Sequence, residues 1–349
     1  MVTRRRRALV FGSPPLDGHG GVESVCRATV DALDRIGFET RYVSGRELAR
    51  AWARSWIPWS RVWGGVAEVW CARGFARRDA QADLVVTNGP VGWGVRGRLS
   101  VHYYHGTYVG QAEAVRPFIR RRGYVKMRYL DGFLLERLAG DAKICLANSA
   151  DTAAEVKRHF GHKCAVVWCP VDTDRFCPGS RNQSLLGRLG IPRRRPLGLF
   201  VGAGRPMKGA RLAYEVMRRV SGVTWLVVGD GEPPPVDIAD RVVVVPTVDP
   251  LDMADILRAA DLFLTASIYE PFGLLVAEAL ACGTPVVCTR SGASDLLMAE
   301  APLNEFVVGD PHDVGRLWTA VERVLGDPGG GTSRGARGEG ARGSTPCIG

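Results

Sequence analysis

The sequence predicts an α/β protein of two Rossmann-like domains, each with a parallel β-sheet. Short apolar runs alternate with amphipathic helical patterns along most of the chain, which is typical of parallel sheets. The length of 349 residues suits two such domains rather than one. We expect the two sheets to face each other across a cleft.

The expected strands are the apolar runs that end near glycine, asparagine or threonine. In the first half they are Ala8–Phe11, Thr40–Val43, Leu84–Thr87, Ser100–Tyr104 and Ile144–Asn148. In the second half they are Leu197–Gly202, Thr224–Val228, Val242–Val245, Leu262–Thr265 and Pro285–Cys288, with Phe306–Val308 as a short last strand.

A Pro-, Asp- and Gly-rich segment that begins at Cys169 indicates the connection between the domains. The predicted domains are therefore residues 1–169 and 170–327. From Pro328 the chain consists mostly of glycine, arginine and other polar residues, which cannot bury a core. We expect a disordered tail over residues 328–349.

Composition argues against a membrane span and against a zinc site. No stretch of about 18 apolar residues occurs, although 46% of the chain is apolar. The nine cysteines form no C-x-x-C pair and lie near no histidine pair of zinc-ligand spacing. Scattered thiols of this kind indicate a reducing compartment, so we expect a cytoplasmic protein.

The net charge of +10 is concentrated in the first half of the chain. Residues 1–175 hold 28 Lys and Arg against 17 Asp and Glu, and residues 176–349 hold 18 against 19. This asymmetry favours an anionic partner or a membrane surface for the first domain. A general preference for arginine, with 41 Arg and 5 Lys, is the alternative.

A glycine-rich turn with two cations follows the first strand of the second half. The run Gly202-Ala-Gly-Arg-Pro-Met-Lys-Gly joins this strand to a helix start. It is not a Walker loop, because no Ser or Thr follows for magnesium. Lys208 is the only lysine after Lys163. We interpret Arg205 and Lys208 as a diphosphate clamp, with a solvated helix start as the alternative.

A second glycine-rich turn follows the first strand of the chain. Gly18, Gly20 and Gly21 lead into a helical pattern from Val22 to Leu33. Backbone N–H groups at such a helix start favour an anion such as phosphate. The spacing is not G-x-G-x-x-G, so a dinucleotide site is not indicated, and a turn without a ligand is the alternative.

Two histidines lie near the end of the strand Ser100–Tyr104. His105 precedes Gly106, and we expect it to leave the strand and face the cleft. His102 lies three residues earlier and is expected on the opposite face of the strand. The alternative for both is a buried structural histidine.

Glu270 and Glu278 lie eight residues apart in a run that contains Pro271 and Gly273. We expect one helix to carry both carboxylates on one side, about 12 Å apart along its axis. That separation suits two ends of an extended polar ligand. A surface helix with two solvated acids is the alternative.

Tryptophan and arginine gather in residues 50–70, and a second basic stretch covers residues 116–128. Trp52, Trp56, Trp59 and Trp63 recur at helical spacing among arginines. Such amphipathic segments dock on membrane surfaces or line acceptor grooves. Tryptophans that face the core are the alternative.

Taken in order, these motifs resemble the retaining GT-B glycosyltransferases of family 4, the glycosyl transferases of group 1. The resemblance covers residues 8 to about 325. The matching segments are Gly20-Gly-Val-Glu, His105-Gly, Asn148-Ser, Pro170-Val-Asp-Thr-Asp-Arg-Phe, Gly204-Arg-x-x-Lys-Gly, Gly229-Asp-Gly and Glu270-Pro-Phe-Gly with Glu278. The fold that it implies is GT-B, with a donor domain in the second half and an acceptor domain in the first.

The resemblance also implies a role for each site residue. Glu278 would bind the ribose hydroxyls of a nucleotide sugar, and Arg205 and Lys208 would hold its diphosphate. Glu270 and the backbone N–H groups of Phe272, Gly273 and Leu274 would contact the sugar and its phosphate. Gly20 and Gly21 would contact the diphosphate, and His105 would contact the sugar near its reacting carbon.

The resemblance implies metal-independent transfer with retention, from a UDP-linked donor, and no cofactor. The acceptor can be lipid-linked, part of the cell envelope or a natural product. A lipid-linked or cell-envelope acceptor would place the protein at the inner face of the membrane. Nucleic acid is not an expected partner. The family's helix that crosses back to the first domain has no counterpart in the Gly/Arg run after Leu325.

Two other functions remain open at this stage. A non-catalytic GT-B protein would bind the nucleotide sugar or a partner without releasing nucleoside diphosphate. A sugar-nucleotide epimerase of the same fold would convert the free donor without an acceptor.

Overall fold

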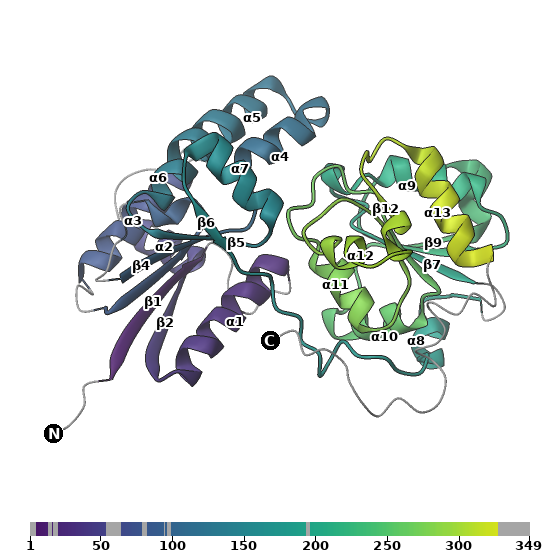
Figure 1. Ribbon diagram of the computed structural model, residues 1–349, viewed down its shortest axis with the longest axis horizontal. Helices are drawn as coiled ribbons and strands as arrows, with labels where there is room; N and C mark the ends of the chain where they lie inside the picture. The colour runs from purple at the N-terminus through teal and green to yellow at the C-terminus, as the bar shows by residue number, and fades with distance from the viewer. Residues whose placement is uncertain are drawn as a thin grey trace. The chain divides into compact units, whose positions relative to one another are not determined.

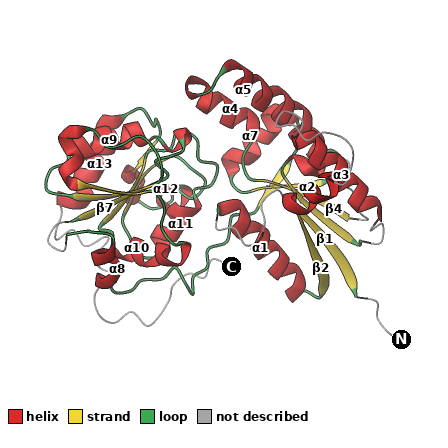
Figure 2. Ribbon diagram, turned by 180° about the vertical axis from the view of Figure 1, so that it is seen from behind, coloured by secondary structure: helices red, strands yellow, loops and turns green. Residues whose placement is uncertain are grey.

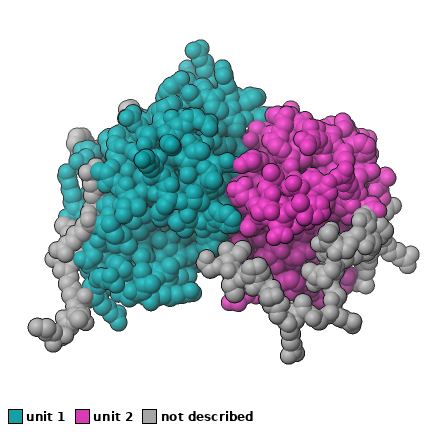
Figure 3. Space-filling model, viewed as in Figure 1, with its two compact units in different colours: residues 1–170, 269–272 teal, residues 171–268, 273–349 magenta. Residues whose placement is uncertain are grey.

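The computed structural model describes residues 5–12, 16, 20–53, 64–78, 82–93, 95, 99–192 and 196–326. Contacts along the chain divide it into two compact units, coloured separately in Figure 3. Unit 1 is Met1–Pro170 together with Tyr269–Phe272, and unit 2 is Val171–Ile268 together with Gly273–Gly349.

This division differs from the predicted domains in two places. The boundary follows Pro170 rather than Cys169, and Tyr269–Phe272, assigned from sequence to the second domain, belongs to unit 1. The second difference arises because the Tyr269 hydroxyl bonds to Thr107 and Glu155. The predicted tail, residues 328–349, lies outside the described residues.

Unit 1 contains a six-stranded parallel sheet in the order β2-β1-β3-β4-β5-β6 (Figure 1). The strands are β1 (Arg6–Gly12), β2 (Phe38–Ser44), β3 (Leu84–Asn88), β4 (Leu99–Tyr104), β5 (Ile144–Ala147) and β6 (Cys164–Val166).

Alternation along β1 places helices on both faces of this sheet. Ala8 and Val10 pack with α1 (Gly21–Arg35), whereas Leu9 and Phe11 pack with α2 (Gly45–Ala53) and α3 (Gly64–Arg78). Since successive side chains of a strand point to opposite faces, a wholly apolar strand needs cover on both. This is the layered α/β architecture that the alternating pattern predicted.

The other helical elements of unit 1 follow β3, β4 and β5. They are η1 (Pro90–Gly92), α4 (Tyr108–Val115), η2 (Arg116–Phe118), α5 (Arg121–Val125), the π-helical η3 (Lys126–Glu136), α6 (Arg137–Gly140) and α7 (Ala150–Phe160). Thr107 caps α4 and Ser149 caps α7, each by accepting a hydrogen bond from a first-turn N–H group.

Unit 2 contains a second six-stranded parallel sheet, in the order β12-β11-β10-β7-β8-β9. Its strands are β7 (Leu197–Val201), β8 (Thr224–Val228), β9 (Val242–Val245), β10 (Leu262–Thr265), β11 (Val286–Thr289) and β12 (Val307–Val308). Helices α9 and α13 cover one face and α10 and α11 the other (Figures 1 and 2).

The helices of unit 2 are α8 (Gln183–Arg188), α9 (Ala210–Arg219), α10 (Met253–Ala259), α11 (Leu274–Ala281), α12 (Asp295–Met298) and α13 (Val314–Gly326). Its 3-10 turns are η4 (Pro206–Lys208), η5 (Val236–Arg241), η6 (Pro250–Asp252) and η7 (Leu303–Phe306). Among the described residues, no helix is both long and apolar enough to span a bilayer.

All the predicted strands are confirmed to within two residues at either end. Strand β6 was not predicted, because Cys164–Val166 is a three-residue edge strand with no long apolar run, in which Cys164 is half-buried and the other two residues are exposed. The two doubly wound sheets confirm the predicted fold class, whereas the cleft stays a prediction.

Each sheet has a point where the chain order reverses. In unit 1 this point lies between β1 and β3, and in unit 2 between β7 and β10. Doubly wound sheets bind ligands at the carboxyl ends of the two strands that meet there. Both of these points carry residues that the sequence analysis singled out.

Candidate functional site

The Arg205–Lys208 turn follows β7, one of the two strands at the reversal point of unit 2. The Arg205 N–H donates to the Gly202 carbonyl and the Lys208 N–H to the Arg205 carbonyl, both at 2.9 Å. The Lys208 side chain folds over Gly202, where a Cβ atom would lie 2.7 Å from its Cγ. Arg205 is exposed and Lys208 half-buried. A short turn therefore holds both cations at the edge of the sheet.

Neighbouring loops fix this turn through their backbones. A Cβ atom at Gly204 would lie 2.3 Å from the carbonyl oxygen of Asp230, in the loop after β8. One at Gly209 would lie 2.0 Å from the carbonyl oxygen of Ala266, after β10. The Ile268 N–H also donates to the Met207 carbonyl at 2.7 Å. The loops after three adjacent strands thus form one rigid edge.

Glu278 lies on α11 of unit 2 and is half-buried. Burial raises the pKa of its carboxyl to about 7, and the Arg175 guanidinium opposes that rise. The carboxyl is therefore poised between its neutral and ionised forms near physiological pH. A ligand that hydrogen-bonds to the carboxylate would favour ionisation.

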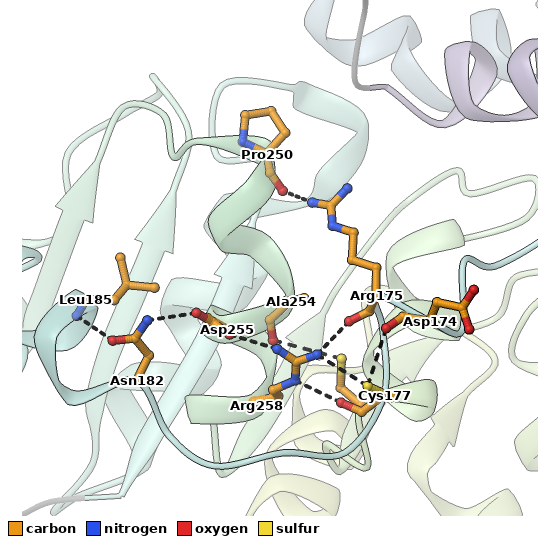
Figure 4. A network of polar contacts seen from close by, with 10 residues as sticks. Asp174, Arg175, Cys177, Asn182, Leu185, Pro250, Ala254, Asp255 and Arg258 are labelled. Atoms are coloured by element: carbon orange, nitrogen blue, oxygen red, sulfur yellow. Dashed lines mark hydrogen bonds and ion pairs between the residues drawn. The ribbon is translucent and has the colours of Figure 1, made fainter.

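Arg175 belongs to a polar network that folds the predicted connecting motif onto α10 (Figure 4). Its guanidinium donates to the Pro250 carbonyl. Arg258 of α10 donates to the Arg175 carbonyl at 2.6 Å and to Asp255 at 2.8 Å. Asn182 also donates to Asp255 at 2.8 Å. This network holds Arg175 where its charge reaches Glu278.

The prediction of one helix that carries both glutamates is wrong. Helix α11 begins only at Leu274, after Gly273 in the left-handed conformation with φ 83° and ψ 55°. Pro271 disfavours helical geometry at Glu270, the residue before it. Glu270 therefore lies outside the helix and within unit 1, whereas Glu278 lies on α11 in unit 2.

In unit 1, His105 follows β4 and is held by the two neighbouring strands. Its Nε2 lies 2.9 Å from Oδ1 of Asn88, at the end of β3. Its carbonyl accepts a hydrogen bond of 3.1 Å from Asn148, directly after β5. Burial lowers the pKa of His105 to about 4, so the ring is neutral at physiological pH.

The segment Tyr269–Phe272 packs beside His105. The Tyr269 hydroxyl accepts from the Thr107 N–H and donates to Glu155 Oε2, both at 2.9 Å. A Cβ atom at Gly106 would lie 2.5 Å from Pro271 Cγ. Glu270 is close enough to add to the rise in the pKa of the buried Cys169, which burial mainly raises to about 12. The structure thus brings His105 and the Glu270 segment together.

His102 is fully buried in β4, and its Nδ1 lies 2.9 Å from the Thr87 hydroxyl. Burial lowers its pKa well below the usual 6.5. These features fit the structural alternative.

Gly20 and Gly21 lie at the start of α1, as predicted. Gly20 is the N-cap residue, and a Cβ atom there would lie 2.4 Å from Oε2 of Glu23. The Glu23 carboxylate therefore lies at this helix start, and its negative charge would repel a phosphate bound there. Gly18 lies outside the described residues.

The predicted site residues thus fall into two groups. Unit 1 holds Gly20, Gly21, His105, Glu270 and the buried Phe272, and unit 2 holds Arg205, Lys208, Gly273, Leu274 and Glu278. Trp56, Trp59 and Trp63 lie outside the described residues, as does the side chain of Trp52.

Sequence reasoning missed three residues of this arrangement. Asn88 and Tyr269 carried no motif signal, and Arg175 appeared only as part of the connecting motif. The one available signal was Asn88's position directly after a buried strand, the usual place for a ligand-side residue in such sheets.

Family models match both halves of the chain. "Glycosyltransferase Family 4" matches residues 19–175 and "Glycosyl transferases group 1" matches residues 195–327. Together the two matches span most of the chain, and its two sheets are those of the GT-B fold. The chain belongs to glycosyltransferase family 4.

Curated relatives carry a more specific name. The D-inositol 3-phosphate glycosyltransferase of Segniliparus rotundus is 32% identical over 239 residues, which cover 61% of this chain and 51% of the relative. The chain thus spans about half the length of the curated relatives that it matches.

Solved structures share the fold. Sucrose-phosphate synthase from Thermosynechococcus elongatus superposes with a TM-score of 0.71 at 20% identity, covering 93% of this chain and 90% of the synthase. HepE from Anabaena, in complex with UDP-glucose, gives a TM-score of 0.61 at 17% identity, with 91% of each chain covered.

Proposed function

We propose that this protein is a glycosyltransferase that moves a sugar from a UDP-linked donor to an acceptor, with retention and without a metal. The observation that carries the proposal is the rigid edge of unit 2, where the Arg205–Lys208 turn lies at the reversal point of the sheet. Two cations fixed by backbone packing suit a diphosphate.

Stabilisation of the leaving group is the physical basis of the proposed transfer. Negative charge accumulates on the departing diphosphate as the glycosidic bond breaks. Fixed cations stabilise that charge without reorganising, which lowers the barrier. Arg205 and Lys208 would supply these cations, and close packing on the carbonyls of Asp230 and Ala266, which fixes the turn that carries them, supports this role. Such a pair can replace the metal that other transferases use.

Glu278 would bind the ribose of the donor. Its carboxylate can accept hydrogen bonds from two adjacent hydroxyl groups, and Arg175 favours the ionised form. Backbone N–H groups of Gly273 and Leu274, at the start of α11, would contribute to the phosphate contacts.

The unit 1 group would contact the sugar. His105 and the Glu270 segment meet at Gly106, and Phe272 continues that segment. We assign His105 and Glu270 to the sugar hydroxyls and the Phe272 N–H to the phosphate. Gly20 and Gly21 would contact the diphosphate once the Glu23 carboxylate had moved away from the start of α1. In this scheme the leaving phosphate takes the acceptor's proton as the acceptor attacks from the same face.

The structure of HepE with UDP-glucose suggests the class of donor. A uridine donor is therefore the first to test. The experiment is mass spectrometry of products from a panel of nucleotide sugars with lysate acceptors. Transfer by the wild type and its loss in Lys208→Ala and Glu270→Ala is expected. Wild-type activity in both variants would refute the assignment, and donor binding without turnover would favour a non-catalytic protein.

The acceptor would be anionic or lipid-linked, reached at the inner face of a cytoplasmic membrane. Arg116, Arg120, Arg121 and Arg122 are all exposed, and Phe118 and Val125 beside them are 46% and 45% exposed. A cationic surface with apolar side chains suits an anionic bilayer. Residues 54–63 of the other predicted stretch lie outside the described residues.

Co-sedimentation with vesicles tests this surface. Binding to anionic vesicles should weaken as salt rises, because surface charges are screened. Replacement of Arg120, Arg121 and Arg122 by Gln should reduce pelleting, whereas Arg211→Gln, on unit 2, should not. Absence of pelleting at low salt would remove the membrane from the proposal.

A further inference from the structure

We propose that Asn88 is a positioning residue that fixes His105 as its Nε2–H tautomer, leaving Nδ1 to accept a hydrogen bond from an uncharged sugar hydroxyl. The tautomer follows from the structure of unit 1 alone. Its role towards the sugar rests on the proposed function.

The Asn88 amide has one orientation. Its Nδ2 donates to the Phe11 carbonyl at 3.1 Å, and a carbonyl oxygen can only accept. A flipped amide would place two oxygens against each other in a buried position, since Asn88 is only 3% exposed. Oδ1 therefore faces the histidine.

This orientation decides where the imidazole proton lies. Oδ1 has no hydrogen to donate, so the 2.9 Å contact with His105 Nε2 requires the proton on Nε2. In a neutral ring the lone pair is then on Nδ1. Among the described residues, no side chain or backbone group hydrogen-bonds to this Nδ1 atom, and we assign it to the sugar hydroxyl.

The surroundings keep the ring neutral and its backbone fixed. Besides Asn88, the groups around His105 include the buried His102, the Tyr103 ring at 4.7 Å between ring centroids, and Asn148, which donates to the His105 carbonyl. Burial raises the pKa of the Tyr103 hydroxyl and lowers that of His105, so both are uncharged at pH 7. Glu270 is the one acidic residue of the segment Tyr269–Phe272, which packs on Gly106.

A chemical preference follows from this arrangement. A neutral ring with a lone pair at Nδ1 accepts a hydrogen bond from a hydroxyl group but repels a carboxylate. The site therefore favours a neutral sugar over a uronic acid at the position that contacts His105. Asn88→Asp would remove this preference, because a carboxylate at position 88 would favour the imidazolium form of His105.

The tautomer is measured by ¹⁵N NMR of the full-length chain with labelled histidine. We expect the Nε2–H signature for wild-type His105, and a shift to imidazolium near neutral pH in Asn88→Asp. Asn88→Leu, which offers no acceptor, should give a mixture of tautomers. The His102 signals, held by Thr87, serve as an internal control. An Nδ1–H signature in the wild type, or unchanged His105 signals in Asn88→Asp, would overturn the proposal.

Donor kinetics test the role towards the sugar. Asn88→Asp should lower kcat/KM for a neutral UDP-hexose about tenfold and make this kcat/KM depend on pH near neutrality. The difference in kcat/KM between the neutral UDP-hexose and a UDP-uronate should become smaller. Binding of UDP alone should not change. Failure of the wild-type protein to bind UDP would refute the proposed function but not the assignment of the His105 tautomer. Unchanged donor preference in Asn88→Asp would refute the role of His105 in selecting a neutral sugar.

Discussion

The carboxyl ends of the two sheets are built in different ways. In unit 1 side-chain hydrogen bonds hold the edge: Asn88 Oδ1 accepts from His105, Asn148 donates to the His105 carbonyl, and Tyr269 accepts from the Thr107 N–H. In unit 2 it is held by backbone packing at Gly204 and Gly209. A ring whose tautomer matters needs oriented partners, whereas a diphosphate needs a rigid cradle that backbones can approach closely.

The largest effect is expected where backbone packing is tightest. Gly209→Ala places a Cβ atom 2.0 Å from the Ala266 carbonyl, at a residue with φ +69°. Left-handed strain and the clash together should destabilise unit 2 by about 3 kcal/mol or more. Urea denaturation followed by tryptophan fluorescence measures this change.

Gly190→Ala is the matched control, because Gly190 has φ +70° but nothing within 4 Å of its Cβ position. It should cost only the strain, about 1–2 kcal/mol. Equal losses in the two variants would contradict the account of a close-packed edge.

Glu278→Gln should stabilise unit 2 in a pH-dependent way. The folded-state pKa of about 7 lies above the ordinary 4.5, so the folded state binds more protons between these values and stability falls as pH rises. Glutamine does not titrate, so the variant avoids that loss. By pH 8 its free energy of unfolding should exceed that of the wild type by about 3 kcal/mol. Denaturation at pH 4 and pH 8 tests the difference, with the exposed Glu322→Gln on α13 as a flat control. A gain that does not depend on pH would contradict the raised pKa.

Lys208→Ala should weaken UDP binding about 10- to 100-fold, because a charge-assisted hydrogen bond contributes about 1.5–3 kcal/mol. Arg211→Ala, near the start of α9, removes an exposed cation paired with Glu232 and should leave affinity within twofold. Titration calorimetry compares them. Similar losses in both variants would indicate a general effect of charge rather than a clamp.

Tyr269→Phe should cost unit 1 about 1–2 kcal/mol, since the Thr107 N–H and Glu155 lose a partner. Tyr124→Phe removes a comparable tyrosine–glutamate bond to Glu113 at the surface and should cost much less, because solvent replaces the lost partner. Thermal unfolding distinguishes the two. An equal cost would mean that the bonds of Tyr269 do not hold its segment.

Most of the fold was predictable because central strands such as Leu262–Thr265 are buried on both faces and read as apolar runs. The cationic turn was predictable because glycine and a rare lysine mark it. Glu270 was misplaced because period alone ignores the helix-breaking geometry of Pro271 and Gly273. Asn88 went unnoticed because its role depends on Phe11 and His105, which only folding brings near.

Hydrogen-exchange mass spectrometry in the presence of UDP would show where the donor binds on the chain. We expect slower exchange of backbone amides in residues 202–209 and 274–281. Exchange in α13, which packs on the opposite face of the sheet from α11 (Figure 1), should not change. Unchanged exchange at 202–209 in the presence of saturating UDP, with protection elsewhere, would contradict it.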